Sequence, residues 1–293
     1  MNKTICFIIN CASNSNKAEV FFRNREPEVL KMFKQAAFIY IDEDGSIRET
    51  ANKAAREYEV IVACGGDGTI KETANALIHT NVILGVLPIG SGNDFAKSIG
   101  LSTDFRKNLE ILRSCKTSGI DVIQYGEGQY FLNTMGFGLD GRTNYYAAIL
   151  NKWTGKLRYF LGGIYAMIKA DRFTYKCSTN KNHIEGSSWM VVAANGAVEG
   201  GKYRISPDSC NSDGIFEIII VKPISRLRLI LEFLKLSMGF SFSKQVIYQV
   251  TTKECSLSLD QKLHIHADGE IVKQKSFSID FKLLKNSLTV IKA

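Results

Sequence analysis

The sequence has few prolines, no paired cysteines and no long apolar run. Its 293 residues include only 4 prolines, and 23% are charged, which argues against long disordered tails. The 7 cysteines are scattered without a C-x-x-C pair, as expected for reduced thiols in the cytosol. No run reaches the roughly 18 uncharged apolar residues of a transmembrane helix, and the polar start MNKTICFIIN does not resemble a signal peptide. We therefore expect a cytoplasmic protein that meets any membrane from its surface.

Basic residues are in excess. Lys and Arg number 37 against 29 Asp and Glu, which gives a net charge of +8 and a pI near 9.0. This balance suits an anionic partner such as nucleic acid, an anionic membrane or a phosphate-bearing substrate. Neither an RRM-type aromatic and basic motif nor zinc-finger spacing is present, so we expect no nucleic-acid partner. The oligomeric state is not readable from the sequence, which leaves a homodimer open.

The first part of the chain, residues 1–120, alternates strand-like and helix-like segments. This order predicts a Rossmann-like parallel sheet with helices on both faces. A G-x-x-x-x-G-K-[ST] P-loop is missing, so a nucleotide would have to be held by other glycine turns. The expected strands cover residues 4–9, 36–41, 59–63 and 82–88, and the expected helices cover residues 18–33, 46–58 and 104–113.

From residue 121 the sequence pattern changes to short strand-like segments separated by turns. Hydrophobic residues make up 45% of the whole chain, which is enough for a second core. We predict an antiparallel β-sandwich domain over residues 121–286, interrupted by two helical segments. A last strand is expected within residues 287–293.

A glycine-rich turn follows the third expected strand. Gly65, Gly66 and Gly68 permit positive φ and close approach of a ligand to the backbone. Thr69 can cap a following helix, with Glu72 completing a capping box. The N–H groups of such a turn and helix start favour an anion. Asp67 lies inside this turn, and a carboxylate beside phosphates implies a bridging cation. The turn is therefore interpreted as a nucleotide-phosphate loop working with Mg²⁺; the alternative is a tight strand-to-helix turn with an exposed Asp.

A second glycine-rich turn follows the next strand, at residues 89–96. Asn93 or Asp94 can cap the helix that begins there, and the Ser91 hydroxyl can donate to a phosphate. Turns at the ends of neighbouring parallel strands face one crevice, where open α/β sheets bind ligands. The two turns together therefore predict a nucleotide site.

Both turns resemble motifs of the diacylglycerol kinase catalytic-domain family, which includes bacterial lipid kinases of the DgkB and YegS type as well as sphingosine and ceramide kinases. NAD kinases share the first motif and carry a different second one. The resemblance implies a first domain similar to the nucleotide domain of NAD kinase and phosphofructokinase, with the last strand, within residues 287–293, returning to it. Lys71 departs from the pattern, since the family more often has Asn there; it either alters the nucleotide-facing turn or is a solvated helix position. The resemblance continues in order through Asn133–Gly138, Asn195–Gly201, Ser206–Gly214 and Asp268–Glu270.

The resemblance implies an ATP-dependent lipid kinase that transfers the γ-phosphate to a lipid hydroxyl, with diacylglycerol as the first expectation and a role in phospholipid biosynthesis. Glu270 is implied as the general base, Asp67 as the residue beside Mg²⁺, and Asp121 as a support of the site. Rival hypotheses are an NAD kinase-like phosphotransferase and a non-catalytic membrane-binding module. The implied ATP-binding residues are Gly65, Gly66, Asp67, Gly68, Thr69, Ile70, Lys71, Ser91, Asn93 and Asp94.

A structural Mg²⁺ site is also implied by the resemblance. It would use the Asp213 side chain with the carbonyls of Cys210 and Ile215, and a plain Asp-Gly turn is the alternative. The literal G-x-G-x-x-G at residues 136–141 suggests a dinucleotide site, but its β-rich surroundings argue against one. Alternating His264, His266 and Asp268 could bind a transition metal, but a strand entering a turn is the favoured explanation, because no third firm ligand appears.

Two segments combine basic and large apolar residues. Residues 145–170 and 223–242 each mix Lys and Arg with aromatic and aliphatic side chains. This composition suits shallow insertion into an anionic bilayer, where the lipid substrate would be met. The alternative is an amphipathic helix packed on the β domain, and the two roles can apply to different faces of one helix.

Overall fold

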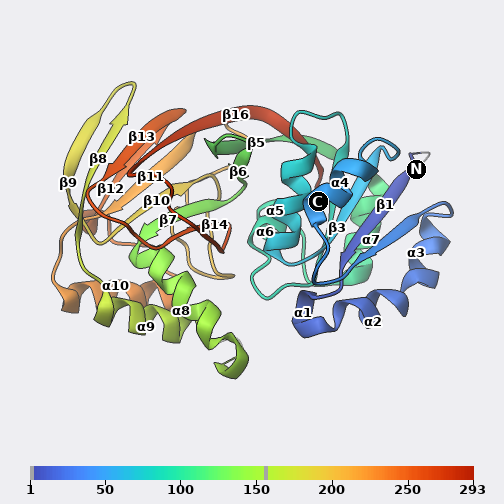
Figure 1. Ribbon diagram of the computed structural model, residues 1–293, viewed down its shortest axis with the longest axis horizontal. Coiled ribbons are helices and arrows are strands. Elements are labelled where there is room, and N and C mark those ends of the chain that lie inside the picture. The colour runs from blue at the N-terminus through green and yellow to red at the C-terminus, as the bar shows by residue number, and fades with distance from the viewer. Residues whose placement is uncertain (1–2, 155–157) are drawn as a thin grey trace. The chain divides into compact units, whose positions relative to one another are not determined.

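The computed structural model describes residues 3–154 and 158–293 of the chain. By its internal contacts the chain divides into two compact units (Figure 1). The first unit comprises Met1–Asp121 and Lys285–Ala293, and the second comprises Val122–Leu284. The predicted fold class is confirmed, because the first unit is a parallel α/β domain and the second an antiparallel β-sandwich.

A parallel sheet forms the centre of the first unit. Its strand order is β2-β1-β3-β4, followed by the C-terminal part of β16, and each of these pairs is parallel. The strands β1, β3 and β4 are buried over nearly their whole length, as continuous apolar runs predict for a sheet covered on both faces. The strands are β1 (Ile5–Asn10), β2 (Ala37–Ile41), β3 (Val60–Gly65) and β4 (Ile83–Pro88).

Helices cover both faces of this sheet. On one face, Phe22 and Leu112 pack with Phe7 and Val62 in one core, while α4 and α5 contact each other and the strands β1 and β3. The predicted single helix over residues 18–33 is wrong: it is broken before Pro27, which lies in the first turn of a new helix because proline lacks an N–H. The helices are α1 (Ser13–Asn16), α2 (Ala18–Arg23), α3 (Glu26–Met32), α4 (Ile47–Ala54), α5 (Asp67–Leu77), α6 (Asp94–Ser98) and α7 (Phe105–Ser114).

The second unit contains two packed sheets. One has the order β12-β11-β10-β7-β14-β15 and is antiparallel throughout; in the other, β13 pairs with β8 and β16, β8 with β9, and β5 with β6. The strands are β5 (Thr117–Gly126), β6 (Gln129–Phe131), β7 (Thr134–Gly138), β8 (Phe173–Thr179), β9 (His183–Ser188), β10 (Met190–Ala194), β11 (Phe216–Val221), β12 (Ile247–Thr252), β13 (Glu254–Leu259), β14 (Ile265–Ala267), β15 (Glu270–Val272) and β16 (Ser278–Ile291).

Three helices form a third layer of the second unit. Phe137, Phe216 and Phe281 belong to the core between the two sheets. A separate core joins the outer face of the antiparallel sheet to α9 and α10, which lie beside α8 in Figure 1. The predicted aromatic and basic residues within 151–159, such as Trp153 and Lys156, have side chains outside the described part. The helices are α8 (Leu139–Thr154), α9 (Arg158–Lys169), α10 (Arg226–Ser237) and the 3₁₀ helix η2 (Lys244–Val246).

Candidate functional site

The two glycine-rich turns contact each other in the first unit. Gly65 and Pro88 end the paired strands β3 and β4, and Ile89 N–H donates to Gly65 O at 2.9 Å. A Cβ placed on Gly90 would lie 2.6 Å from the Cα of Gly66, so no side chain fits between the two backbones. The turns therefore form one continuous backbone surface at the carboxyl edge of the sheet, as the sequence predicted.

Asp67 joins the two turns. Its Oδ2 accepts a hydrogen bond from Asn93 N–H and its Oδ1 accepts one from Asp94 N–H, each at 2.7 Å. These two N–H groups belong to the start of α6 and would otherwise lack partners. Burial raises the pKa of the Asp67 carboxyl above its usual value, and the bonds from the second turn oppose that rise. Asp67 thus positions the second turn; its predicted contact with Mg²⁺ would have to use the remaining lone pairs.

The start of α5 differs from the prediction in two respects. The helix begins at Asp67 with Gly66 as its N-cap, so Thr69 and Glu72 form no capping box. Thr69 Oγ1 instead accepts from Asn10 Nδ2 at 2.9 Å, while Glu72 pairs with Arg48. The three glycines also need no positive φ. The requirement at Gly65 is space, since a Cβ there would meet Thr69 at 2.3 Å.

The other predicted nucleotide residues occupy different environments. Ile70 and Lys71 are buried in α5, so the alternative that Lys71 is a solvated position is wrong. Ser91 is exposed in the second turn. Asn93 is the N-cap of α6 in the left-handed conformation, and its Nδ2 donates to Gly90 O at 2.8 Å. The structure thus brings these residues to one edge of the sheet, while their contact with ATP stays a prediction.

A loop that the prediction left out also reaches this edge. Asn10 ends β1 and Ser13 begins α1 after a short loop, and both approach Thr69. Asn14 lines a pocket with Gly90 and Asn93. The available signal was a polar loop at the carboxyl end of a parallel strand, which is where such sheets bind ligands.

Asp121 lies elsewhere in the first unit. Its side chain is fully buried, and Oδ1 accepts from Asn286 N–H at 2.8 Å. This bond ties β5 to β16, whose C-terminal part pairs with β4 through Thr289 and Val290. Asp121 therefore supports the returning strand, and its predicted role beside the nucleotide stays a prediction.

Glu270 begins β15 in the second unit, directly after the hairpin turn of Asp268 and Gly269. Both turn residues have positive φ, at 51° and 78°, as a two-residue hairpin with a type I′ turn requires. The Asp268 carboxylate accepts from the backbone N–H groups of Leu132, Asn133 and Thr134, at 2.8 to 3.2 Å. The turn that presents Glu270 is therefore fixed to the start of β7.

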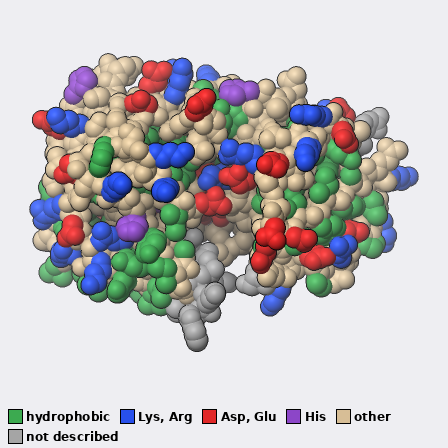
Figure 2. Space-filling view, viewed as in Figure 1, with side chains coloured by type: hydrophobic (Ala, Val, Ile, Leu, Met, Phe, Trp, Pro, Cys, Tyr) green, Lys and Arg blue, Asp and Glu red, His purple; other side chains and the backbone are tan. Residues whose placement is uncertain are grey.

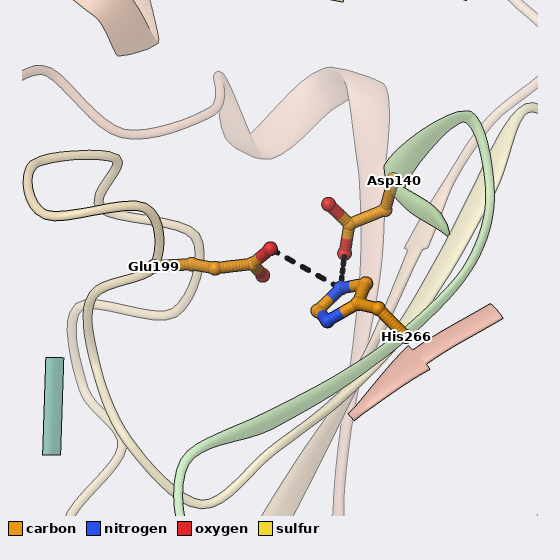
Figure 3. A group of neighbouring side chains, drawn as sticks. All are labelled: Asp140, Glu199 and His266. Atoms are coloured by element: carbon orange, nitrogen blue, oxygen red, sulfur yellow. Dashed lines mark hydrogen bonds and ion pairs between the residues drawn. The ribbon is translucent and has the colours of Figure 1, made fainter. Parts of the chain in front are cut away.

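A buried cluster lies behind this turn (Figure 3). His266 Nε2 lies 3.0 Å from Asp140 Oδ2 and 3.1 Å from Glu199 Oε1. Glu199 also accepts from Asn144 Nδ2 at 3.0 Å and from Thr134 Oγ1 at 3.1 Å. Gly136 makes room for the cluster, because a Cβ there would lie 1.9 Å from Asp140 Oδ2. The glycine pattern at residues 136–141 is thus a packing requirement.

The cluster is an ion-pair network. Burial disfavours charge on His266, but Glu199 and Asp140 outweigh it and raise its pKa to about 9. Gly269 N–H lies 3.3 Å from Nδ1 and donates to it only when that atom carries no proton. The three ligand atoms lie within 4.8 Å of one another, a spacing that a divalent cation could also bridge by replacing the Nε2 proton. His264 stays outside this group and packs on Tyr145 instead.

A small apolar cavity of about 50 Å³ adjoins the cluster within the second unit. Leu229, Leu236 and Phe242 are among its apolar walls, while Asp140 and Glu199 lie at its polar end. Asp140 and Glu199 escaped the sequence prediction, because Asp140 lies 126 residues from His266 and no local pattern joins them. Contacts thus run from the cavity through His266 to Gly269 and the turn of Glu270.

The predicted Mg²⁺ loop carries more acid than expected. Asp213 Oδ1 accepts from Ile215 N–H at 3.1 Å, and Cys210 is exposed in the same loop. Burial raises the pKa of Glu217, and the nearby Asp213 and Asp208 raise it further. Three carboxylates at one loop would be relieved by a cation. Asp208, Asp213 and Glu217 are not among the described groups whose ligand atoms are spaced to hold one metal ion, so a Mg²⁺ here would be held by Asp213 with backbone carbonyls, as predicted. This site stays a prediction, and Glu217 is an additional acid near the loop that the sequence motif did not indicate.

Comparisons with known proteins cover nearly the whole chain. Residues 4–125 match the family model described as diacylglycerol kinase catalytic domain, and residues 133–292 match the YegS C-terminal NAD kinase beta sandwich-like domain. A curated relative named diacylglycerol kinase, from Bacillus subtilis (strain 168), is 27% identical over 266 residues, which are 88% of each chain.

Solved structures share the fold. A structure described as a diacylglycerol kinase from Bacillus anthracis str. Sterne is 20% identical, with a TM-score of 0.78 over all of this chain and 98% of the other. A second structure from that strain is 22% identical, with a TM-score of 0.84 over all of this chain and 96% of the other.

Proposed function

The chain belongs to the YegS-like diacylglycerol kinase family, and from this premise we propose that it is a lipid kinase that transfers the γ-phosphate of ATP to a lipid hydroxyl. The observation that carries the proposal is the contact of the two glycine turns at the carboxyl edge of the parallel sheet, with Asp67 holding the second turn against the first. Diacylglycerol is the proposed acceptor, by analogy with the Bacillus subtilis relative.

The first unit offers a fitting nucleotide site. The side-chain-free surface at Gly66 and Gly90 lets a polyphosphate approach the backbone, and the first turn of α5 directs N–H groups outward. When bound with ATP, Mg²⁺ would neutralise charge on the phosphates. Asp67 contributes by holding the turns in place, and phosphoryl transfer depends mainly on such positioning and on charge neutralisation.

The second unit offers groups for a lipid. The apolar walls of its cavity suit acyl chains, and the polar end at Asp140 and Glu199 suits hydroxyl groups. We assign the general-base role to Glu270. In the reaction the lipid oxygen forms a bond to the γ-phosphorus, the bond from that phosphorus to the bridging oxygen of ADP breaks, and the hydroxyl proton goes to the Glu270 carboxylate.

Radiolabelled ATP with Mg²⁺ and a panel of acceptors in mixed micelles tests the proposal. The panel holds diacylglycerol, phosphatidylglycerol, a sphingoid base, a polyprenol and NAD. Label is expected in the diacylglycerol product. Label in NAD alone would identify an NAD kinase-like enzyme, and absence of both ATP binding and transfer would leave only a membrane-binding module.

Variants assign the roles. Asp67→Asn and Glu270→Gln are each expected to lower transfer by a factor of about 10² or more, in the range of a lost acid–base or positioning group. Glu110→Gln, a carboxylate-to-amide change on the exposed face of α7, is the matched control and is expected to keep full activity. Normal transfer by Glu270→Gln would exclude Glu270 as the base.

A further inference from the structure

The helix α10 is apolar on two opposite faces. Leu229 and Leu236 are buried and pack on the antiparallel sheet of the second unit. Leu227, Leu231 and Met238 lie four and seven residues apart, so they share the opposite face of the helix. Their exposed fractions are 71%, 48% and 66%. One apolar face thus explains the packing of α10, and the other is presented to solvent.

The neighbouring helix α9 repeats this arrangement. Leu161, Tyr165 and Ile168 also lie four and three residues apart, and each is exposed by 40% or more. Ala166 and Met167 of the same helix are buried in the core that also contains Leu229. Since both helices turn their buried sides to one sheet, their exposed stripes face the same way. Figure 1 shows the two helices side by side, and Figure 2, in the same view, shows hydrophobic side chains exposed in this region.

A hydrogen-bonded clamp holds the two helices together. Arg226, the first residue of α10, donates from Nη1 to the carbonyls of Met167 and Ile168 at 2.9 and 3.1 Å. These carbonyls belong to the last turn of α9, where a cation is favoured by the helix dipole. The two stripes therefore form one surface, which we call the α9–α10 face. It is defined by Leu161, Tyr165, Ile168, Leu227, Leu231, Met238 and the exposed Phe240.

The charges of the two helices have one sign at the surface. α9 contains no acidic residue. α10 contains one, Glu232, which is buried and paired with Arg228 and Lys235. Burial acts to raise the pKa of Glu232, but bonds from Ser243 and Lys235 outweigh it and hold the pKa below its ordinary value. The exposed ionisable groups of both helices, as far as their side chains are described, are thus basic; the one exposed acid beside them, Asp171 after α9, pairs with Arg226 at 3.8 Å.

From these observations we propose that the α9–α10 face docks on an anionic bilayer. Apolar side chains flanked by basic ones are the pattern of helices that lie in a membrane interface and insert only their apolar face. A contiguous apolar patch of this kind is unusual on a protein without a partner. Its basic rim complements anionic headgroups, and within the described chain no helix is long and apolar enough to cross a bilayer. The docking surface goes beyond the proposed phosphoryl transfer and needs no ATP.

Vesicle flotation without ATP tests the docking. The parent protein is expected to float with vesicles of phosphatidylcholine and phosphatidylglycerol, to bind less to phosphatidylcholine alone, and to bind less as salt rises. Leu231→Ser and Phe240→Ser are each expected to weaken partitioning on the order of tenfold, since each removes one large apolar side chain from the bilayer. Both side chains are exposed, so the fold should tolerate the changes.

Matched controls separate docking from general loss of hydrophobicity. Leu30→Ser and Phe277→Ser remove the same residue types from exposed positions elsewhere, at 39% and 50% exposure, and are expected to leave flotation unchanged. Equal flotation of the parent and the Leu231→Ser, Phe240→Ser double variant would overturn the proposal. The proposal would also be overturned if the parent sediments as a dimer, the double variant sediments as a monomer, and flotation is unchanged. The face would then bind a second copy of the chain.

A soluble acceptor keeps this test apart from that of the proposed function. The double variant is expected to phosphorylate a short-chain, water-soluble diacylglycerol as well as the parent does. Loss of that transfer would show damage to the reaction and would overturn the assignment of these residues to docking. If the parent floats with vesicles but phosphorylates no acceptor, the docking surface stands and the proposed function fails.

Discussion

Replacing His266 with glutamine should make the stability of the second unit almost independent of pH between 6.5 and 9. The imidazole is fully buried between Asp140 and Glu199. Glutamine has similar length and still donates a hydrogen bond, but it cannot carry the positive charge. The variant therefore leaves two buried carboxylates without their cation, at a cost expected from breaking a buried ion pair, about 3–5 kcal/mol.

The pH dependence gives a second estimate of the same energy. Glu199 and Asp140 raise the pKa of His266 from 6.5 to about 9, against the effect of burial. The folded protein thus holds this proton more tightly than the unfolded chain. The resulting stability is fully present below pH 6.5 and is lost as pH rises through about 9. At about 1.4 kcal/mol for each pH unit, the shift corresponds to about 3 kcal/mol.

Urea unfolding at several pH values measures the effect. Fluorescence of Trp189, which is buried in the second unit, reports the transition. The stability difference between the parent and His266→Gln should be largest near pH 6 and should shrink by about 3 kcal/mol by pH 10. His183→Gln is the control, because His183 is exposed and a surface change should stay within about 0.5 kcal/mol. A difference that stays constant with pH would refute the charged cluster.

Three further predictions concern other parts of the molecule. Gly90→Ala should lower the free energy of unfolding by about 1–3 kcal/mol and weaken ATP binding, because its Cβ has no room. Gly186→Ala, where a Cβ makes only ordinary contacts, should do neither in the same calorimetric and binding assays. Asp213→Asn should abolish the rise in thermal stability that Mg²⁺ gives the parent, and an unchanged rise would place the ion elsewhere. In the native protein a disulfide reagent should label the exposed Cys210 at once and Cys64 only on unfolding, since burial raises the pKa of Cys64 well above its usual value. Early labelling of Cys64, seen in a peptide map, would contradict its burial.

The parallel sheet and the contact of its turns could be predicted from sequence because each depends on local signals. Runs such as residues 82–88 are apolar throughout, which requires cover on both faces and hence a parallel sheet with helices. Turns after neighbouring strands of such a sheet must meet at one edge. The exact helix start could not be predicted, because Asp67, and not Thr69, supplies the hydrogen bonds, and it supplies them to a different helix.

The hairpin that carries Glu270 shows which contacts the local sequence cannot predict. Asp-Gly predicts a tight turn, yet the contacts that fix this turn come from the N–H groups of residues 132–134, which donate to Asp268. The alternation of His264, His266 and Asp268 suggested a shared metal. In the structure the three side chains have different partners, because β14 ends at Ala267 and the turn redirects Asp268. Such partners come from strands far apart in the chain.

Gly136 illustrates why the same glycine motif can have different structural roles in different folds. In a dinucleotide site the glycines of G-x-G-x-x-G make room for a pyrophosphate. Here a Cβ on Gly136 would collide with Asp140 Oδ2 and His266 Nε2, so the glycine makes room for a buried ion pair. The requirement is therefore conditional: a side chain at position 136 is excluded only while His266 and Asp140 occupy that space. The motif and the cluster are one structural unit, and the cluster in turn contacts Gly269 in the turn that presents Glu270.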